Sequence, residues 1–444
     1  MQPESRETPR FTTPAGPIEG WIDGAVRRAT GIPYATALRG EEPIAVEDRE
    51  EVLFATEWAP ACPQNPAPLL EERLGYRPDE LHYDEDCLRL SVTMPAEESD
   101  EPLPVLVWIH GGSYVSGAGD IGFMDPAPLV ADAQVIVVTV TYRLGALGYV
   151  GGGSRPANLG VLDQWLAFEW VKRNIAAFGG DPENVTAFGE SAGADAVLHL
   201  MAIPGAPKLM KRAIVQSAPL GSLTADRPKM HEQMVPTLAG VNEHMPIDEV
   251  LALEKVAAKA AAGFGLSSAM PYGPQPGVAP FAPGVGLTEA LARVAPEIEL
   301  MIGHTKEEAR FFLESIPALA KLGSVPLVGG ALQGLAARAL TKSAYAKPAR
   351  ELAATMRAAG GRVSRFVVTW SAPGNPFGAC HTVDLAMLFG DERAWRDATL
   401  VRGASWVEIE QSGRIVRRAW GAFARGRHPE PHDGAAGVIR FERA

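Results

Sequence analysis

Ser191 is the residue whose surroundings point most clearly to chemistry, because it lies at the centre of the segment GESAG (189–193). An apolar run typical of a strand precedes this segment, and an apolar stretch at helical spacing follows it. A strand-to-helix turn sharp enough to expose a serine hydroxyl leaves no room for side chains at Gly189 and Gly193. The pattern alone occurs by chance in about one chain in four of this length, and it also fits a tight turn with an ordinary serine. The predicted strand before it and the predicted helix after it are what indicate a nucleophile. Together they predict a nucleophile for acyl transfer, with the amide of Ala192 directed at the substrate oxygen.

A second glycine-rich turn, His110-Gly111-Gly112-Ser113, follows the apolar run VLVWI. Backbone N–H groups at such a strand end can stabilise the negative charge that develops on a carbonyl oxygen during acyl transfer. Alone, the turn could equally be an ordinary connection between a strand and a helix. Beside a nucleophilic serine it predicts an oxyanion hole.

A serine nucleophile needs a general base within hydrogen-bond reach, and histidine is the usual choice. The histidines that follow the serine are His199, His231, His244, His304, His381, His428 and His432. His199 stands on the helix that leaves the serine and cannot fold back, whereas His428 and His432 lie in a polar tail that contains proline. His381 lies on the loop GACHTVDL after the last strong strand run, and the residues alone leave it open beside His231, His244 and His304.

The base needs a carboxylate that orients its ring and stabilises its charged form. A predicted strand leads into the adjacent pair Glu307 and Glu308, although such a pair is most often two solvated charges at the start of a helix. Adjacent side chains leave the backbone in different directions, so only one of the two is expected to reach the histidine. The residues alone leave this choice open, and Asp384 and Asp391, which follow His381, are alternatives.

The elements that must position these residues read as alternating strands and helices. Apolar runs that predict buried strands occupy 104–112, 135–145, 185–189, 213–217, 298–303 and 365–370. Apolar residues recur at spacings of three and four over 159–179, which predicts a helix. The sequence therefore predicts an α/β protein with a mostly parallel central sheet covered by helices. The alternation breaks at 218–297 and 313–364, which we interpret as helical insertions above the sheet within a single domain, 1–444.

Composition argues against several other classes of protein. The chain has 444 residues, 46% of them hydrophobic, and a formal net charge of -12 without any Lys/Arg-rich run, so we expect no binding to nucleic acid. The start, MQPESRETPRF, lacks the pattern of a signal peptide, and no apolar run approaches the ~18 residues of a membrane span, so a cytoplasmic protein is expected. The three cysteines, Cys62, Cys87 and Cys380, have no zinc-site spacing. We expect no metal and no organic cofactor, and the sequence makes no prediction about oligomeric state.

Many short segments, in order over most of the chain, resemble the type-B carboxylesterase and cholinesterase family, including its bacterial para-nitrobenzyl-esterase-like carboxylesterases. The segments are GIPYA (31–35), ACPQ (61–64), EDCLRL (85–90), WIHGGSY (108–114), NLGVLDQ (158–164), FGGDPENVTAFGESAG (178–193), IVQSA (214–218), IGHTKEEA (302–309) and GACH (378–381). The resemblance implies the α/β-hydrolase fold and a serine carboxylic-ester hydrolase, with the chain order serine, acid, histidine.

The resemblance also implies roles for individual residues. The implied catalytic triad is Ser191, Glu308 and His381. The implied oxyanion hole consists of the amides of Gly112, Ser113 and Ala192, with Gly111 as a supporting turn residue.

Four further assignments rest on the same resemblance. Glu190 and Ser217 are similar to family residues that hydrogen-bond around the histidine, although both could equally serve local structure. Cys62 and Cys87 occupy family cysteine positions, so a disulfide between them is possible in an oxidising environment. Arg39 is a candidate partner for Glu85.

We expect a two-step acyl transfer on a small-molecule ester: Ser191 attacks while His381 takes its proton, the alcohol leaves, and water then releases the acid. The alternative is a non-catalytic cholinesterase-like binding protein, because the family contains adhesion members that keep the fold and bind partners. Those members typically lose the nucleophile, whereas this chain keeps all three triad candidates.

Overall fold

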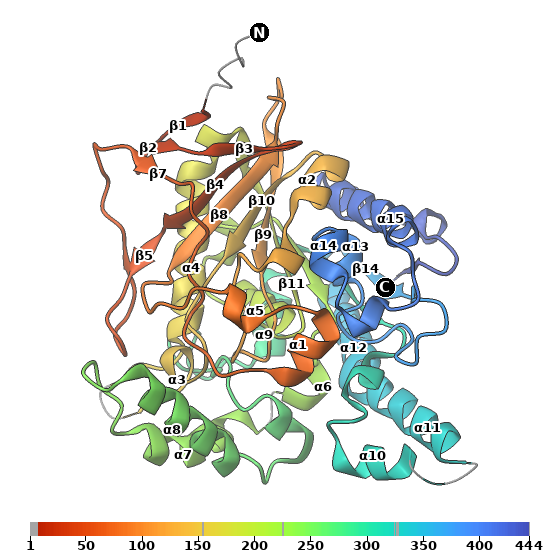
Figure 1. Cartoon of the computed structure of the whole chain (residues 1–444). Helices are drawn as coiled ribbons and strands as arrows, with labels where there is room; N and C mark the ends of the chain where they lie inside the picture. Colours follow the sequence, from red (N-terminus) through yellow and green to blue (C-terminus); the bar gives the residue numbers. More distant parts are fainter. Residues whose placement is uncertain (1–7, 153–154, 224–225, 324, 326–327, 444) are drawn as a thin grey trace.

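The computed structural model describes residues 8–152, 155–223, 226–323, 325 and 328–443. Within these residues, ten strands form one sheet in the order β15-β14-β13-β12-β11-β9-β10-β8-β4-β3 (Figure 1). The strands are β3 (Trp21–Asp23), β4 (Val26–Pro33), β8 (Arg89–Pro95), β9 (Leu103–Ile109), β10 (Ile136–Val140), β11 (Gly180–Glu190), β12 (Arg212–Gln216), β13 (Glu299–Thr305), β14 (Val363–Val368) and β15 (Ile439–Arg443).

The centre of the sheet is parallel, and its edges are antiparallel. Strands β10, β9, β11, β12, β13 and β14 are neighbours in parallel, and each overlaps one of the apolar runs that predicted a buried strand. On the outside, β8 pairs antiparallel with β10, β4 with β8, β3 with β4, and β15 with β14. The prediction of a mostly parallel sheet is confirmed, while the antiparallel edges were not predicted, because their sequences are too polar to form continuous apolar runs.

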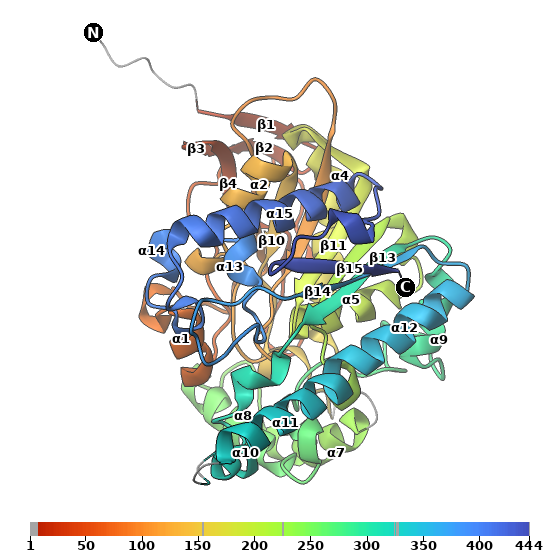
Figure 2. The same cartoon turned by 90° about the vertical axis from the view of Figure 1, so that its right-hand side faces the viewer.

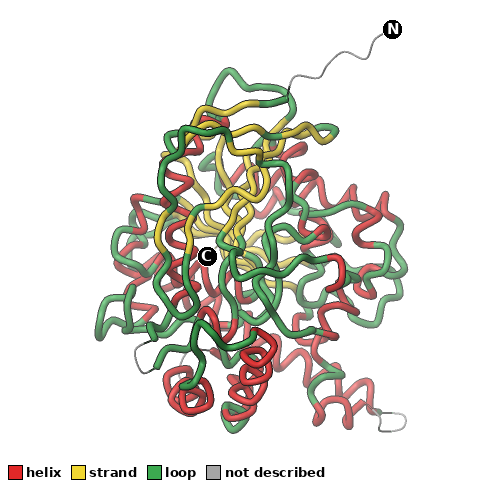
Figure 3. Tube along the Cα trace, turned by 60° about the vertical axis from the view of Figure 1, so that its left-hand side comes forward, coloured by secondary structure: helices red, strands yellow, loops and turns green. Residues whose placement is uncertain are grey.

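Two smaller sheets lie near the N-terminal part of the chain (Figure 3). One joins β1 (Arg10–Thr13), β2 (Gly16–Glu19) and β7 (Leu53–Phe54), and the other pairs β5 (Ala35–Thr36) with β6 (Ile44–Ala45).

Each face of the large sheet is covered by helices, because successive side chains of a buried strand point to opposite faces. Val105, Val107 and Ile109 of β9 belong to one apolar cluster, together with α4 (Leu159–Asn174), α5 (Ala192–Met201) and α12 (Lys347–Ala358). Leu106 and Trp108 of the same strand belong to a second cluster, with α2 (Ala127–Ala133), α13 (Leu385–Leu388) and α15 (Trp406–Ala424). Figure 2 shows α15 running across this second face.

The two ranges interpreted as insertions hold further helices. The first range holds α6 (Leu220–Leu223), α7 (Arg227–Leu238), α8 (Ile247–Ala260), η5 (Gly265–Ala269) and α9 (Leu287–Val294). The second holds α10 (Pro317–Gly323), α11 (Gly329–Thr341), the π-helical turn η7 (Lys342–Ala346) and α12. Helices α7, α8, α10 and α11 lie beyond one end of the sheet (Figures 1 and 2), whereas α12 packs on β13 and β14 and α9 packs on α5.

Short helices complete the connections. They are α1 (Pro68–Leu74), η1 (Pro78–Glu80), η2 (Gly122–Met124), α3 (Gly145–Gly148), η3 (Ile175–Phe178), η4 (Ala206–Lys208), η6 (Glu308–Phe312), α14 (Glu392–Trp395), η8 (Thr399–Val401) and η9 (Pro431–Asp433). None of the helices in the described part of the chain is long and apolar enough to cross a membrane. Among those same residues, no group of three or more His, Cys, Asp or Glu side chains is arranged to hold a metal ion.

Candidate active site

Ser191 stands at the junction between β11 and α5, at the point where the chain turns sharply. Its backbone has φ 57° and ψ -121°, a conformation that non-glycine residues rarely adopt. The start of α5 lies so close to β9 that a Cβ on Gly193 would sit 2.0 Å from the carbonyl oxygen of Ile109. The turn is therefore possible only because residue 193 has no side chain. The strained turn raises the serine out of the strand and leaves its hydroxyl at the C-terminal edge of the parallel sheet, where α/β proteins bind their ligands.

The glycine-rich turn after β9 faces this serine. Gly112 has φ 107° and Ser113 has φ 57°, and a Cβ on Gly112 would sit 2.1 Å from the carbonyl oxygen of Ser116. The N–H groups of Gly112, Ser113 and Ala192 donate to no other residue that the structure describes. Three unpaired donors beside one hydroxyl are what an oxyanion hole requires.

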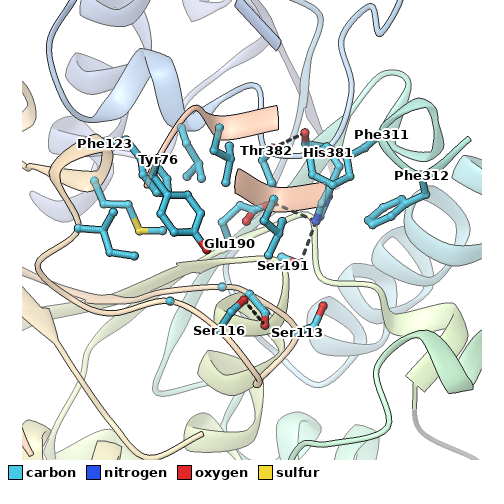
Figure 4. Close-up of a pocket in the computed structure, with 18 residues that line it drawn as sticks. Tyr76, Ser113, Ser116, Phe123, Glu190, Ser191, Phe311, Phe312, His381 and Thr382 are labelled. Carbon is cyan, nitrogen blue, oxygen red and sulfur yellow. Dashed lines mark hydrogen bonds and ion pairs between the residues drawn. The ribbon is translucent and has the colours of Figure 1, made fainter. Parts of the chain in front are cut away.

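The three residues implied as a triad come together from the segments that follow β11, β13 and β14. Figure 4 shows two of them, Ser191 and His381. The ring nitrogen Nε2 of His381 lies 2.8 Å from Oγ of Ser191, and Nδ1 of the same ring lies 2.6 Å from Oε2 of Glu308. The second oxygen of Glu308 accepts a hydrogen bond of 2.7 Å from the backbone N–H of Thr305, which fixes the carboxylate. Glu308 is fully buried and His381 is 2% exposed, so water does not compete for these bonds.

The other carboxylates considered as the acid lie elsewhere. Glu307 forms an ion pair of 2.8 Å with Arg310 and accepts from the N–H of Ala379 at 3.2 Å. Asp384 is buried but accepts from the amide of Gln216 at 2.7 Å, and Asp391 caps α14 by accepting from Ala394 at 2.9 Å. Of the four candidates, only Glu308 forms a hydrogen bond with the imidazole ring of His381.

The electrostatics of the site favour a charged imidazole. Burial lowers the pKa of His381, but the carboxylates of Glu190 and Glu308 outweigh burial and raise this pKa to about 9. Burial also opposes ionisation of Glu308, yet the charge and the hydrogen bond of His381 lower the pKa of its carboxyl overall. The arrangement can therefore stabilise an imidazolium next to the serine.

The supporting residues implied by the resemblance lie around the same ring. Oε1 of Glu190 is 3.3 Å from Nε2 of His381, and burial raises the pKa of Glu190 well above its usual range. Ser217 lies beside Glu308 and lowers the pKa of its carboxyl, although its hydroxyl completes no hydrogen bond of normal geometry with a described residue. Gly111 packs so closely that a Cβ there would sit 2.8 Å from the carbonyl oxygen of Glu190.

A buried polar cluster behind the site was missed by the sequence reasoning. The hydroxyl of Tyr114 donates to Oδ2 of Asp195 at 2.8 Å, and Arg227 donates to the same oxygen at 3.3 Å. Tyr114 belongs to the glycine-rich turn, Asp195 to the helix that carries the serine, and Arg227 to α7. Asp195 lies one helical turn after Ser191, and this spacing was the available signal. Its partners could not be found, because they are distant in sequence.

Aromatic side chains around the imidazole were also missed. The rings of Phe311, Phe312 and Tyr345 lie 5.7, 5.4 and 5.5 Å from the ring of His381. The pair Phe311 and Phe312 follows Glu308 after two intervening residues, which is a local signal that could have found them. Tyr345 comes from the π-helical turn η7, and no sequence pattern predicts a turn of this kind.

The cavity above the serine is narrow, with a volume of about 40 Å³. Figure 4 shows Tyr76 and Phe123 on one side of Ser191 and Phe312 on the other. Apart from Ser191, His381 and the glycine-rich turn, the lining is mostly apolar and comes from Leu70, Leu74, Tyr76, Ile121, Phe123, Met124, Phe311, Phe312 and Leu385, together with Ser116, Gly117, Glu190 and Thr382. A small apolar cavity with polar groups at one point is suited to an uncharged carbonyl substrate.

The cysteines and Arg39 complete the comparison with the sequence predictions. Cys62 and Cys87 are buried free thiols, so the possible disulfide is not formed in this structure. The neighbouring thiol of Cys62, together with burial, raises the pKa of Cys87 well above its usual range. Arg39 donates to Glu85 at 2.8 Å, as the resemblance implied.

Comparison with known proteins agrees with this geometry. A model of the carboxylesterase family matches residues 7–325. The chain is 38% identical over 429 residues, or 95% of its length and 94% of the relative, to a probable N-octanoylanthranilate hydrolase from Rhodococcus erythropolis. It is also 40% identical over 240 residues to a para-nitrobenzyl esterase from Bacillus subtilis, a match that spans 52% of this chain and 48% of that protein.

Solved structures give the same result for the fold. A carboxylesterase from Geobacillus stearothermophilus superposes with a TM-score of 0.77 at 27% identity, covering 97% of this chain and 93% of that one. A thermophilic PNB esterase superposes with a TM-score of 0.75 at 30% identity, covering 96% and 92%. These matches confirm the α/β-hydrolase fold and favour an enzyme over the non-catalytic binding protein. The chain belongs to the carboxylesterase family and is a carboxylic-ester hydrolase.

Proposed function

We propose that this enzyme hydrolyses esters through an acyl-enzyme formed on Ser191, with His381 as general base and Glu308 as the orienting carboxylate. One observation carries the proposal: the hydrogen-bonded chain from Ser191 Oγ to His381 Nε2 at 2.8 Å and from His381 Nδ1 to Glu308 at 2.6 Å. Oxyanion donors from Gly112, Ser113 and Ala192 complete the constellation that acyl transfer needs.

The proposed reaction has two halves. In the first, Ser191 Oγ attacks the ester carbonyl while Nε2 of His381 takes its proton, and the charge on the carbonyl oxygen is stabilised by the three N–H groups. The imidazolium then gives the proton to the leaving alkoxide, which departs as the alcohol and leaves an ester on Ser191. In the second half, Nε2 of His381 takes a proton from water as the water oxygen attacks the acyl carbonyl, and the imidazolium then returns this proton to Oγ of Ser191 as the bond to the acyl group breaks, which releases the carboxylic acid and restores the serine hydroxyl.

The decisive experiment uses p-nitrophenyl acetate and a fluorophosphonate probe. We expect the wild-type enzyme to hydrolyse the ester and to be labelled covalently on the peptide that contains Ser191. Ser191→Ala removes the nucleophile, so it should abolish labelling and lower kcat by at least about 10³-fold while the circular dichroism spectrum stays unchanged. Labelling that persists in this variant would mean that another serine is the nucleophile.

A second candidate substrate is an N-acyl amide, because the relative that matches 95% of this chain is named as a probable N-octanoylanthranilate hydrolase. The same groups would perform the reaction, with the imidazolium of His381 protonating a leaving amine in place of an alcohol. Parallel assays of p-nitrophenyl octanoate and N-octanoylanthranilate separate the two candidates. A kcat/KM for the amide that exceeds that for the ester would make the amide the preferred substrate.

We also propose that residues 1–444 form a single α/β-hydrolase domain with helical segments at 218–297 and 313–364. Supporting this, strands near both ends of the chain, β3 and β15, belong to one sheet. Limited proteolysis tests this proposal. We expect cleavage within the helical segments, and we expect the resulting fragments to stay together and to unfold in one transition.

A further inference from the structure

Helix α11 carries an apolar face that nothing in the described structure covers. Val328 at its N-cap, Leu332 and Leu335 recur at spacings of four and three, and they are 50%, 40% and 58% exposed. Ala337, which lies on the opposite side of the helix, is buried where α11 packs on α10 and η6. Single exposed apolar residues are common, but three in one line form a patch that calls for a partner.

The same face is positively charged on a negatively charged protein. Arg338 and Lys342 continue the line of exposed residues, and the side chain of neither forms an ion pair or hydrogen bond with a residue that the structure describes. Between Glu314 and Glu351 the sequence has five basic residues, Lys321, Arg338, Lys342, Lys347 and Arg350, and no acidic one. The whole chain has 53 acidic residues in 444 and a net charge of -12. The segment 315–350 is therefore positively charged within a negatively charged protein.

The α11 face (Val328, Leu332, Leu335, Arg338 and Lys342) is joined to the active site at its C-terminal end. The hydroxyl of Thr341, the last residue of α11, accepts from the N–H of Ala309 at 3.1 Å, next to Glu308. The following π-helical turn brings Tyr345 to 5.5 Å from the ring of His381. Figures 1 and 2 show α10 and α11 at one end of the molecule, away from α15.

We propose that the α11 face docks on an anionic lipid bilayer. An amphipathic helix binds such a surface by inserting apolar side chains at the headgroup level while neighbouring cations approach the lipid phosphates. Val328, Leu332 and Leu335 supply the apolar side chains, and Arg338 and Lys342 supply the cations. The net charge of -12 repels an anionic surface from the rest of the molecule, so the face that attracts it also orients the enzyme.

Charge argues for a lipid surface over a second copy of the chain. A twofold dimer would place the α11 face of one copy against the same face of the other, and would bring Arg338 and Lys342 close to their own counterparts. Like charges brought together at an interface weaken it, whereas the same cations strengthen contact with phosphate groups.

Vesicle co-sedimentation of the full-length chain tests the proposal. One set of vesicles contains phosphatidylcholine alone, and the other contains about one third phosphatidylglycerol. We expect binding to the anionic vesicles only, with a loss of binding when salt is raised from about 0.1 M to about 0.5 M. Absence of binding to the anionic vesicles, or equal binding to both kinds, would overturn the proposal.

Two pairs of variants link binding to the α11 face. The charge variant Arg338→Gln/Lys342→Gln should weaken the apparent partition coefficient on the order of tenfold. Its matched control, Arg414→Gln/Arg418→Gln on α15, removes two exposed arginines at the same spacing and should bind as the wild type does. Equal losses in both would mean that overall charge, and not this face, drives binding.

The apolar variant is Leu332→Asp/Leu335→Asp, and its control is Val407→Asp, which alters a residue 63% exposed on α15. Only the first should lose vesicle binding. All variants should keep wild-type hydrolysis of dissolved p-nitrophenyl acetate, which separates this proposal from the proposed serine mechanism. Sedimentation velocity without lipid tests whether the α11 face binds a second copy of the chain. If the wild type is a dimer and the Leu332→Asp/Leu335→Asp variant is a monomer, the α11 face is a dimer interface and the lipid proposal is wrong.

Discussion

The hydroxyl of Tyr114 donates a hydrogen bond of 2.8 Å to the buried carboxylate of Asp195. This bond ties the turn that carries the oxyanion donors to the helix that carries the serine. It thereby connects the two parts of the proposed oxyanion hole, Ser113 on the turn and Ala192 on the helix. Arg227 completes the carboxylate's partners from α7.

We predict that Tyr114→Phe lowers both stability and turnover. The substitution removes a hydrogen bond to a buried charged group, which is worth about 1.5–3 kcal/mol of the free energy of unfolding. Because the oxyanion donors lose their tether, kcat should fall about tenfold while KM changes little. Urea unfolding and steady-state kinetics measure the two effects. The matched control is Tyr83→Phe, whose hydroxyl donates to Pro78 in an exposed loop, and it should change neither quantity. A Tyr114→Phe enzyme with wild-type kcat would contradict this role.

We predict that Glu308→Gln lowers kcat by about 10³- to 10⁴-fold, because the imidazolium of His381 loses its partner and the wrong tautomer becomes populated. Glu307→Gln changes a neighbour that pairs with Arg310, so it should cost less than about tenfold. Both variants are compared on one ester after circular dichroism shows that each is folded. Asp384→Asn serves as a further control for a buried carboxylate near the ring. If Glu307→Gln or Asp384→Asn is the inactive variant, the assignment of the acid is wrong.

We predict that kcat/KM rises with pH toward about 9, the pKa of His381, because only the neutral imidazole can take the serine proton. The pKa is raised by Glu190 and Glu308, so removing the charge of Glu190 should lower it. Glu190→Gln is therefore expected to move the ascending limb to lower pH by about one unit. The measurement is kcat/KM for an uncharged ester between about pH 5.5 and pH 10. An ascending limb at the same pH in Glu190→Gln would mean that Glu190 does not raise the pKa of His381.

We predict that Cys62 and Cys87 form a disulfide when the protein is treated with a thiol oxidant, since both are buried free thiols and the thiol of Cys62 is near enough to raise the pKa of Cys87. Closing a loop of ~25 residues should raise the free energy of unfolding by about 3 kcal/mol. Thiol counting on denatured protein that has not been reduced should then find one free thiol, that of Cys380. Three free thiols after oxidation would rule the bridge out.

The sequence by itself determined the features whose signals are local. The central strands were predicted because strands buried on both faces must be almost continuously apolar, as VLVWI and VIVVTV are. Ser191 was predicted because a turn this tight excludes side chains at its flanking positions, which leaves glycines as a mark in the sequence. The resemblance to known esterases then extended these local signals to Glu308 and His381.

The tertiary structure alone decided which side chains meet. Glu307 and Glu308 have the same chemistry, and only the direction in which each leaves the backbone sends one to His381 and the other to Arg310. The contact of Tyr114 with Asp195 joins residues 81 positions apart, and the approach of Tyr345 to His381 depends on a π-helical turn within a segment of weak pattern. Such contacts are fixed by how helices and strands pack in space, and packing leaves no periodic or compositional trace in a single sequence.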